Sequence, residues 1–175
     1  MERRESDHRR RESRLAGSAD RFKVVVPKYE VVLVRPDIAG NTGQIGRTCM
    51  ALGCRLHLVH PLGYKITDAN LKRAGLDYWP NLDLKQHDSV ADWMASMEPA
   101  REVWLLSTKA EKIWNPHEAA PGATLVFGSE TCGIPPEVHA RWAGRERKIA
   151  IDPRARSLNL SACVAMTLGS LILPR

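Results

Sequence analysis

Short apolar runs recur along the chain from Phe22 onward, and helical patterns separate them. Each run spans only a few residues and is bounded by Gly, Pro or polar residues, which is typical of buried strands. The runs predict strands at Val31–Arg35, Leu56–His60, Glu102–Leu106, Thr124–Phe127 and Lys148–Ile151. The intervening patterns predict helices at Thr42–Leu52, Asp68–Ala74, Ser89–Met97, Pro136–Trp142 and Asn159–Ile172.

Alternation of strands and helices, with strands rich in Val, Leu and Ile, predicts an α/β fold: a parallel sheet with helices on both faces. Ligands of such sheets bind at the carboxyl ends of the strands. We therefore expect the functional loops to begin near Arg35, Pro61, Ser107, Gly128 and Asp152.

The first 21 residues mix arginines with acids and carry almost no apolar side chains. Such a segment buries too little surface to offset its ordering entropy. We expect a disordered tail at 1–21, as a solvated segment or an RNA-gripping arm, followed by one domain at 22–175. The acids in the tail, such as Glu2 and Glu5, argue against a transit peptide.

Composition is ordinary for a globular protein, with 43% apolar and 26% charged residues. No apolar stretch approaches a membrane span, and the N-terminus lacks a signal-peptide core. We therefore expect a cytoplasmic protein without a membrane partner. The net charge of +6 favours, weakly, a polyanionic partner such as RNA.

The cysteines and histidines do not indicate a metal site. The four cysteines form no CxxC pair and lie in apolar or glycine-rich surroundings, so we expect reduced packing residues. His57 and His60 are three apart on a predicted strand and should point to opposite faces. We predict no bound metal.

The loop GNTGQIGR, residues 40–47, follows one predicted strand and leads into a helix. Its glycines, Gly40, Gly43 and Gly46, have the spacing GxxGxxG, whereas a dinucleotide site uses GxGxxG. The Lys-Ser/Thr pair of a P-loop is also missing. A nucleotide-phosphate loop is therefore the weaker interpretation.

Two further loops are rich in polar residues. In LVFGSETCGIP, residues 125–135, Gly128 and Gly133 permit close backbone approach to a ligand, while Ser129 and Glu130 offer polar contacts. In RARSLNLSACVAM, residues 154–166, Ser157 and Asn159 precede an almost wholly apolar helix. These side chains either cap that helix or face a site.

The motifs NTGQIGR, FGSETCGIP and RSLNLS, with LKRAGLDYW at 71–79 and LLSTK at 105–109, resemble the SPOUT superfamily of S-adenosylmethionine-dependent RNA methyltransferases. The resemblance extends from about Val31 to Thr167. The motifs are most similar to those of the TrmL (YibK-like) group. That group methylates the 2′-oxygen of the wobble nucleotide 34, a cytidine or modified uridine, of certain leucine tRNAs.

The resemblance implies a C-terminal trefoil knot, a homodimer, tRNA as substrate and S-adenosyl-L-methionine as cofactor. It also implies residue roles. Matching positions place the cofactor against Leu106, Ser107, Thr108, Gly128, Ser129, Glu130, Ile149, Ile151, Ser157, Leu158 and Asn159. Other matches and nearby basic residues predict RNA contacts at Lys72, Arg73, Tyr78 and Lys109.

The resemblance implies that Arg47 is the catalytic residue and that Asn41 holds the site together. A guanidinium remains protonated and is a poor base, so we expect Arg47 to grip an RNA phosphate and orient the 2′-hydroxyl. Alternatively, Asn41 caps the helix, and Arg47 is a solvated arginine of its first turn, which the helix dipole disfavours.

Three alternatives remain at this point. The target could be another tRNA or ribosomal RNA 2′-hydroxyl, or the chain could be a non-catalytic RNA-binding factor with this fold. Tyr78 could equally be a packing residue. Cys132 stands where the family often has arginine, so an RNA contact is expected to be lost or moved.

Overall fold

Six parallel strands form one sheet in the computed structural model, which describes residues 29–65 and 79–173. Their order across the sheet is β3-β2-β1-β5-β4-β6, and each neighbouring pair is parallel. The strands are β1 (Glu30–Val34), β2 (Arg55–Val59), β3 (Leu84–His87), β4 (Val103–Leu106), β5 (Thr124–Phe127) and β6 (Glu146–Arg147).

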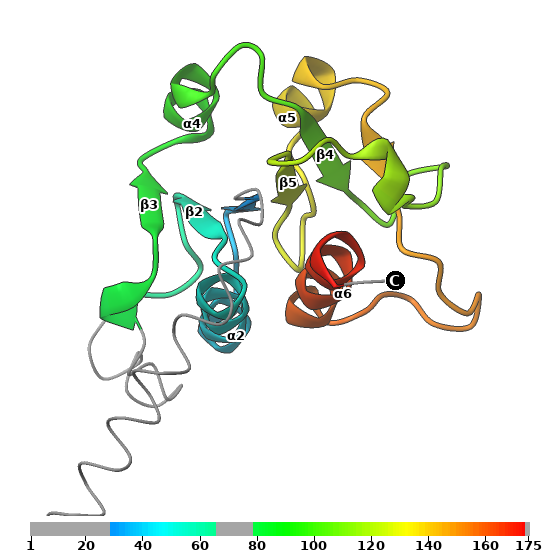
Figure 1. Cartoon of the computed structure of the whole chain (residues 1–175), viewed down its shortest axis with the longest axis horizontal. Coiled ribbons are helices and arrows are strands. Elements are labelled where there is room, and N and C mark those ends of the chain that lie inside the picture. Colours follow the sequence, from blue (N-terminus) through cyan, green and yellow to red (C-terminus); the bar gives the residue numbers. More distant parts are fainter. Residues whose placement is uncertain (1–28, 66–78, 174–175) are drawn as a thin grey trace, which may run out of the picture.

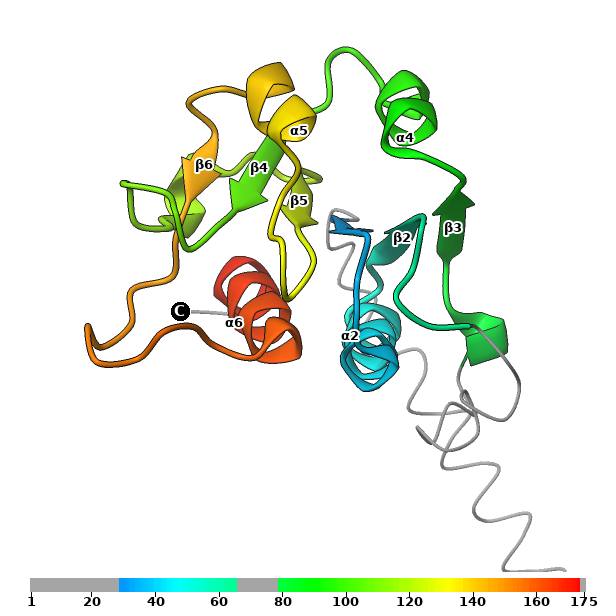
Figure 2. The ribbon, with the colours of Figure 1, turned by 180° about the vertical axis from the view of Figure 1, so that it is seen from behind.

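Helices cover both faces of this sheet (Figures 1 and 2). Helices α2 (Ala39–Ala51) and α6 (Leu160–Ile172) lie side by side on one face. Helices α4 (Val90–Ser96) and α5 (Pro136–Arg141) cover the other. Short 3-10 turns lie at Trp79–Asn81 and Pro116–Glu118. The predicted α/β fold with helices on both faces is therefore confirmed.

The strands are apolar without interruption because both of their faces are buried. In β1, Val31 and Leu33 pack toward α2 and α6, whereas Val32 and Val34 pack toward α4 and α5. Each fully buried side chain of this kind contributes about 1.5–3 kcal/mol to stability. Trp93 and Trp104 belong to these cores.

Most predicted elements are confirmed with small boundary shifts. Four predicted strands correspond to β1, β2, β4 and β5. Four predicted helices correspond to α2, α4, α5 and α6, although α2 begins at Ala39, three residues early. The predicted helix Asp68–Ala74 and the expected tail at 1–21 lie outside the described residues.

The predicted strand Lys148–Ile151 is wrong. The observed strand β6 is Glu146–Arg147, and Lys148 makes an isolated bridge with Ile113. A buried arginine is tolerated in this strand because Glu118 accepts hydrogen bonds from its Nε and Nη2 atoms at 2.9 and 2.6 Å. The Arg147 guanidinium also lies 4.4 Å from the centroid of the Trp104 ring. The sequence pattern missed β3 as well, because its residues LKQH are mostly polar.

Among the residues that the structure describes, no helix is both long and apolar enough to span a bilayer.

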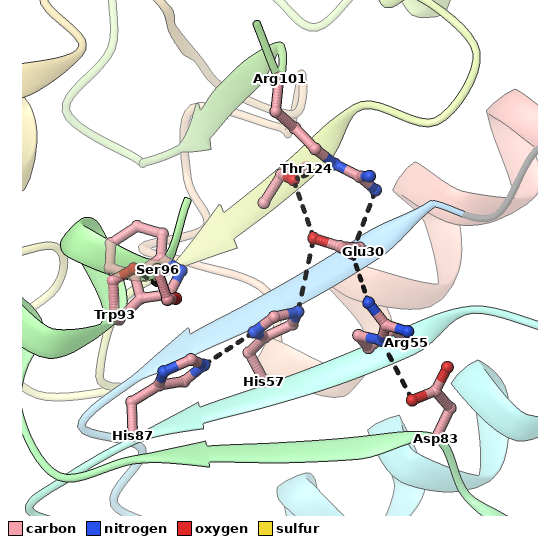
Figure 3. Close-up of polar contacts among 9 residues, drawn as sticks. All are labelled: Glu30, Arg55, His57, Asp83, His87, Trp93, Ser96, Arg101 and Thr124. Atoms are coloured by element: carbon pink, nitrogen blue, oxygen red, sulfur yellow. Dashed lines mark hydrogen bonds and ion pairs between the residues drawn. The ribbon is translucent and has the colours of Figure 1, made fainter. Parts of the chain in front are cut away.

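A buried carboxylate, Glu30, organises the amino ends of three strands (Figure 3). It lies 3.1 Å from Arg55 Nη1, 3.3 Å from Arg101 Nη2 and 3.4 Å from His57 Nε2. His57 in turn contacts His87 through a 2.9 Å hydrogen bond between ring nitrogens. Burial raises the pKa of Glu30, but His57 and the two arginines outweigh it and lower the pKa to about 2.

Glu30→Gln should lower the free energy of unfolding by on the order of 2 kcal/mol near neutral pH, because the neutral amide leaves two arginines without their shared carboxylate. The folded-state pKa of Glu30 is depressed, so its charge stabilises the fold above the ordinary value of 4.5 and ceases to do so as the pH falls toward about 2. The difference between wild type and mutant in urea denaturation should therefore shrink across that range. The exposed Glu98, as Glu98→Gln, is the control and should change little. A difference that stays constant on acidification would contradict this account.

Candidate active site

Parallel pairing brings the loops that follow β1, β5, β4 and β6 to one edge of the sheet. Leu106 at the end of β4 pairs with Phe127 of β5 and with Arg147 of β6. Ser107 extends this pairing, since its N–H donates to the carbonyl of Arg147 at 2.9 Å. The predicted cofactor residues Ser107 and Gly128 therefore begin neighbouring loops.

Asn41 joins three of these loops through its side-chain amide. The side chain is 6% exposed, in the first turn of α2. Its Nδ2 donates to Glu130 Oε1 at 2.8 Å, and its Oδ1 accepts from Asn159 Nδ2 at 2.9 Å. The second carboxylate oxygen of Glu130 accepts from the N–H of Asp37 at 2.8 Å. Asn41, Glu130 and Asn159 thus form one hydrogen-bonded cluster.

Helix capping explains only one of the two asparagines. The N-cap of α2 is Ile38, without a side-chain hydrogen bond, so the alternative role of Asn41 as a cap is wrong. Asn159 does cap α6, because its Oδ1 accepts from the N–H groups of Ser161 and Ala162. Asn159 therefore fixes the start of α6 and touches Asn41 at the same time.

The loop after β5 is a tight turn that requires glycine at two positions. A Cβ at Gly128 would lie 2.0 Å from the carbonyl carbon of Gly133. Gly133 has a positive φ of 73°, which side chains rarely adopt. Backbone bonds in both directions between Ser129 and Gly133 close the turn. This geometry presents the Glu130 side chain toward α2.

Asp37 belongs to the same group of loops as the Asn41 cluster, although the sequence pattern did not single it out. Its Oδ2 accepts from the hydroxyl of Thr131 at 2.7 Å and from the N–H of Thr131 at 3.1 Å. The Thr131 hydroxyl is the main cause of a lowered pKa for Asp37, which keeps this carboxylate charged. Asp37 follows the end of β1 by three residues, and this position at the carboxyl edge of the sheet could have identified it from the sequence.

Arg47 lies away from this cluster. Because α2 begins at Ala39, Arg47 is its ninth residue and lies in the third turn, so the first-turn interpretation is wrong. It is exposed and lies about 9 Å along the helix axis from Asn41. A ligand that contacts both Arg47 and the cluster would therefore have to extend along the first three turns of α2.

The other predicted residues have mixed placements. Leu106 and Ser129 are buried at the sheet edge, whereas Thr108, Ser157 and Lys109 are exposed. Ile149, Ile151 and Leu158 are partly buried in the connection from β6 to α6. The predicted RNA contacts Lys72, Arg73 and Tyr78 lie outside the described residues.

No disulfide links the four cysteines. Cys49 and Cys54 are buried, as expected, whereas Cys132 is exposed on the loop after β5, so the packing role predicted for it is wrong. Within 29–65 and 79–173, no group of three or more His, Cys, Asp or Glu side chains could hold a metal ion.

Comparison with known proteins gives consistent results. The SpoU rRNA Methylase family model matches residues 28–169. A protein of Burkholderia ambifaria named tRNA (cytidine(34)-2′-O)-methyltransferase is 40% identical over 144 residues, which cover 79% of this chain and 90% of the relative. A protein of the same name from Saccharophagus degradans is 40% identical over 134 residues, 76% of this chain and 86% of the relative.

Solved structures agree. One, from work on the 2-OH methylation of C/U34 on tRNA, has a TM-score of 0.75 and 39% identity, covering 82% of this chain and 93% of that one. Another, of an AdoMet-bound rRNA methyltransferase from Sinorhizobium meliloti, has a TM-score of 0.71 at 24% identity, covering 82% of this chain and 55% of that one, and shares the fold. With a family model matched across most of its length, this chain belongs to the SpoU methylase family.

Proposed function

We propose that this chain is an S-adenosylmethionine-dependent tRNA 2′-O-methyltransferase that acts on nucleotide 34. The observation that carries the proposal is the 40% identity to a relative named tRNA (cytidine(34)-2′-O)-methyltransferase, along 90% of that relative. The Asn41, Glu130 and Asn159 cluster supports it, because it places polar groups of three loops together at the functional edge of the sheet.

The cofactor site in this proposal lies at the ends of β5, β4 and β6. S-adenosylmethionine supplies a methyl group already activated by its sulfonium, so the protein must hold it and align the ribose. The chain fits this task, since Ile149 and Ile151 offer partly buried apolar surface and Gly128 lets the loop after β5 fold tightly against Gly133 beside them. The proposed contacts are Leu106, Ser107, Thr108, Gly128, Ser129, Glu130, Ile149, Ile151, Ser157, Leu158 and Asn159.

The reaction requires the ribose oxygen to bond to the methyl carbon as the carbon–sulfur bond breaks. The hydroxyl proton passes to an RNA phosphate or to water. A guanidinium cannot serve as a base, so Arg47 acts by binding phosphate bidentately and orienting the ribose. Asn41 and Glu130 hold the loops that frame the reaction. The exposed Lys109 supplies a further phosphate contact.

The proposal is tested with purified protein, tRNA and labelled S-adenosylmethionine. We expect calorimetry to detect cofactor binding and sequencing to map a new 2′-O-methyl group to nucleotide 34. A folded protein that binds no cofactor would indicate a non-catalytic factor instead. Methylation confined to another nucleotide would reject the substrate while retaining the reaction.

Arg47→Lys should reduce the turnover number by up to about 100-fold, because a lysine ammonium cannot hold a phosphate bidentately and misplaced reactants react slowly. Calorimetric affinity for S-adenosylmethionine should not change. Arg141→Lys, at another exposed helical arginine, is the matched control and should retain activity. Near-normal turnover in Arg47→Lys would make the positioning role untenable.

A homodimer is part of the proposal, and α6 offers a surface for it. Val164 and Leu168 of this helix face the core, whereas Met166 is 52% exposed beside the exposed Ala165. An exposed apolar side chain on a largely apolar helix is suited to a second copy of the chain.

Met166→Glu should shift the protein from dimer to monomer, because it places a charge in the apolar contact. Light scattering after size-exclusion chromatography measures the mass. Ala95→Glu, at an exposed position of α4 on the opposite face of the sheet, should leave the dimer intact. If both variants remain dimeric, the interface lies elsewhere.

A further inference from the structure

The neighbouring strands β1 and β5 send the chain to opposite faces of the sheet. The loop after β1 leads to α2 on one face, and the loop after β5 leads to α5 on the other (Figure 1). Such a divergence opens a crevice at the carboxyl edge, where open α/β sheets bind their ligands. A cavity of about 370 Å³ lies there, between the loops that follow β1, β2 and β5.

The walls of this cavity are largely apolar. Pro61 and Leu62 line one side, and Ile134 and Pro135 line the other. Pyrrolidine and aliphatic surfaces suit the flat face of an aromatic ring, whereas a phosphate requires donors and positive charge. The ligand that fits these walls is therefore a flat, uncharged ring.

The cavity shares its rim with the Asn41 cluster. Asp37 and Ser129 both line it. The N–H of Asp37 donates to Glu130 Oε2, and Ser129 directly precedes Glu130 in the chain. A nucleotide whose ribose lies at Glu130 can therefore extend its base into the cavity.

Arg35 gives the rim a hydrogen-bond donor in an unusual conformation. Its φ is 53°, in the left-handed region that residues other than glycine rarely adopt and that clusters at functional sites. Its side chain is half exposed and lies 3.6 Å from Glu137. An exposed pair of this kind is weak, so the guanidinium can exchange Glu137 for a ligand.

We propose that this cavity holds the pyrimidine base of the nucleotide whose ribose is methylated. Arg35 donates to the O2 carbonyl, which cytosine and uracil share. Asp37 accepts from the N4 amino group of cytosine or from N3–H of uracil, since a carboxylate can accept several hydrogen bonds. The inference rests on the proposed function and adds how the substrate base is bound.

The test compares stem-loop RNAs that carry cytidine, uridine or an abasic ribose at position 34, in single-turnover methylation. With wild-type protein the abasic RNA should react about 10–100-fold more slowly than the cytidine RNA, because burial of the ring in an apolar cavity contributes roughly that much. Cys132→Trp fills the cavity from an exposed position on its lining. In this variant the methylation rate of the cytidine RNA should fall to the rate that wild-type protein shows with the abasic RNA. The methylation rate of the abasic RNA itself should not change.

Two further variants sharpen the result. Ala140→Trp adds the same ring at an exposed position of α5 that does not line the cavity, and it should behave as wild type. Arg35→Asn removes the guanidinium with a residue that tolerates the left-handed backbone. It should slow the cytidine and uridine RNAs by a similar factor, about tenfold, and spare the abasic RNA.

Three outcomes would overturn the inference. They are equal losses on cytidine and abasic RNA in Cys132→Trp, weaker S-adenosylmethionine binding in that variant, and wild-type protein that methylates abasic RNA as fast as cytidine RNA. The second outcome would assign the cavity to the cofactor. Wild-type protein that methylates none of the RNAs would instead reject the proposed function, and the base pocket with it.

Discussion

The site depends on one buried amide, that of Asn41, which hydrogen-bonds in two directions. It donates to Glu130 and accepts from Asn159, residues 89 and 118 positions away in the chain. An ionised carboxylate can only accept, so Glu130 determines which end of the amide faces it. An aspartate at position 41 would place two acceptors together, and an alanine would leave the partners unsatisfied at a cost of about 1–3 kcal/mol. Asparagine is the residue that satisfies both partners.

The turn at 128–133 separates two regions of the same sheet edge. On one side lie the ends of β4 and β6, where the proposed cofactor residues gather. On the other side lies the cavity between the loops after β1, β2 and β5. Gly128 and Gly133 make the turn tight enough to fit between them. Glu130, carried on this turn, therefore lies where a cofactor from one side and a nucleotide from the other would meet.

The pattern of apolar residues predicted those strands and helices whose own side chains form the core. The apolar runs of β1, β2, β4 and β5 and the four helices were recognisable for that reason. The strands that the sequence pattern did not predict, β3 and β6, share a cause: contacts with residues distant in the sequence compensate for a polar local sequence. Arg147 can be buried in β6 because Glu118 accepts its hydrogen bonds and the Trp104 ring packs against its guanidinium. Neither residue is a neighbour of Arg147 in the sequence.

Contacts between residues distant in the sequence also limited what could be predicted of the site. Loop positions at the ends of predicted strands indicated where it lies, and the family resemblance supplied the residue roles. The pairing of Asn41 with Glu130 and Asn159 required the fold, because nothing within the GNTGQIGR loop distinguishes a helix cap from a bridge between loops. Asp37 was within reach of the strand-end argument, since it follows β1 by three residues.

The two ends of β1 are linked through strand register. At the amino end, Glu30 is opposite Arg55 of β2 and Thr124 of β5, and it contacts both side chains. A slip of one residue would separate these groups and turn every apolar side chain of β1 to the wrong face. At the carboxyl end, the same register determines where Asp37 meets the loop that carries Glu130. The buried charge at one edge of the sheet therefore helps to fix the geometry of the site at the other.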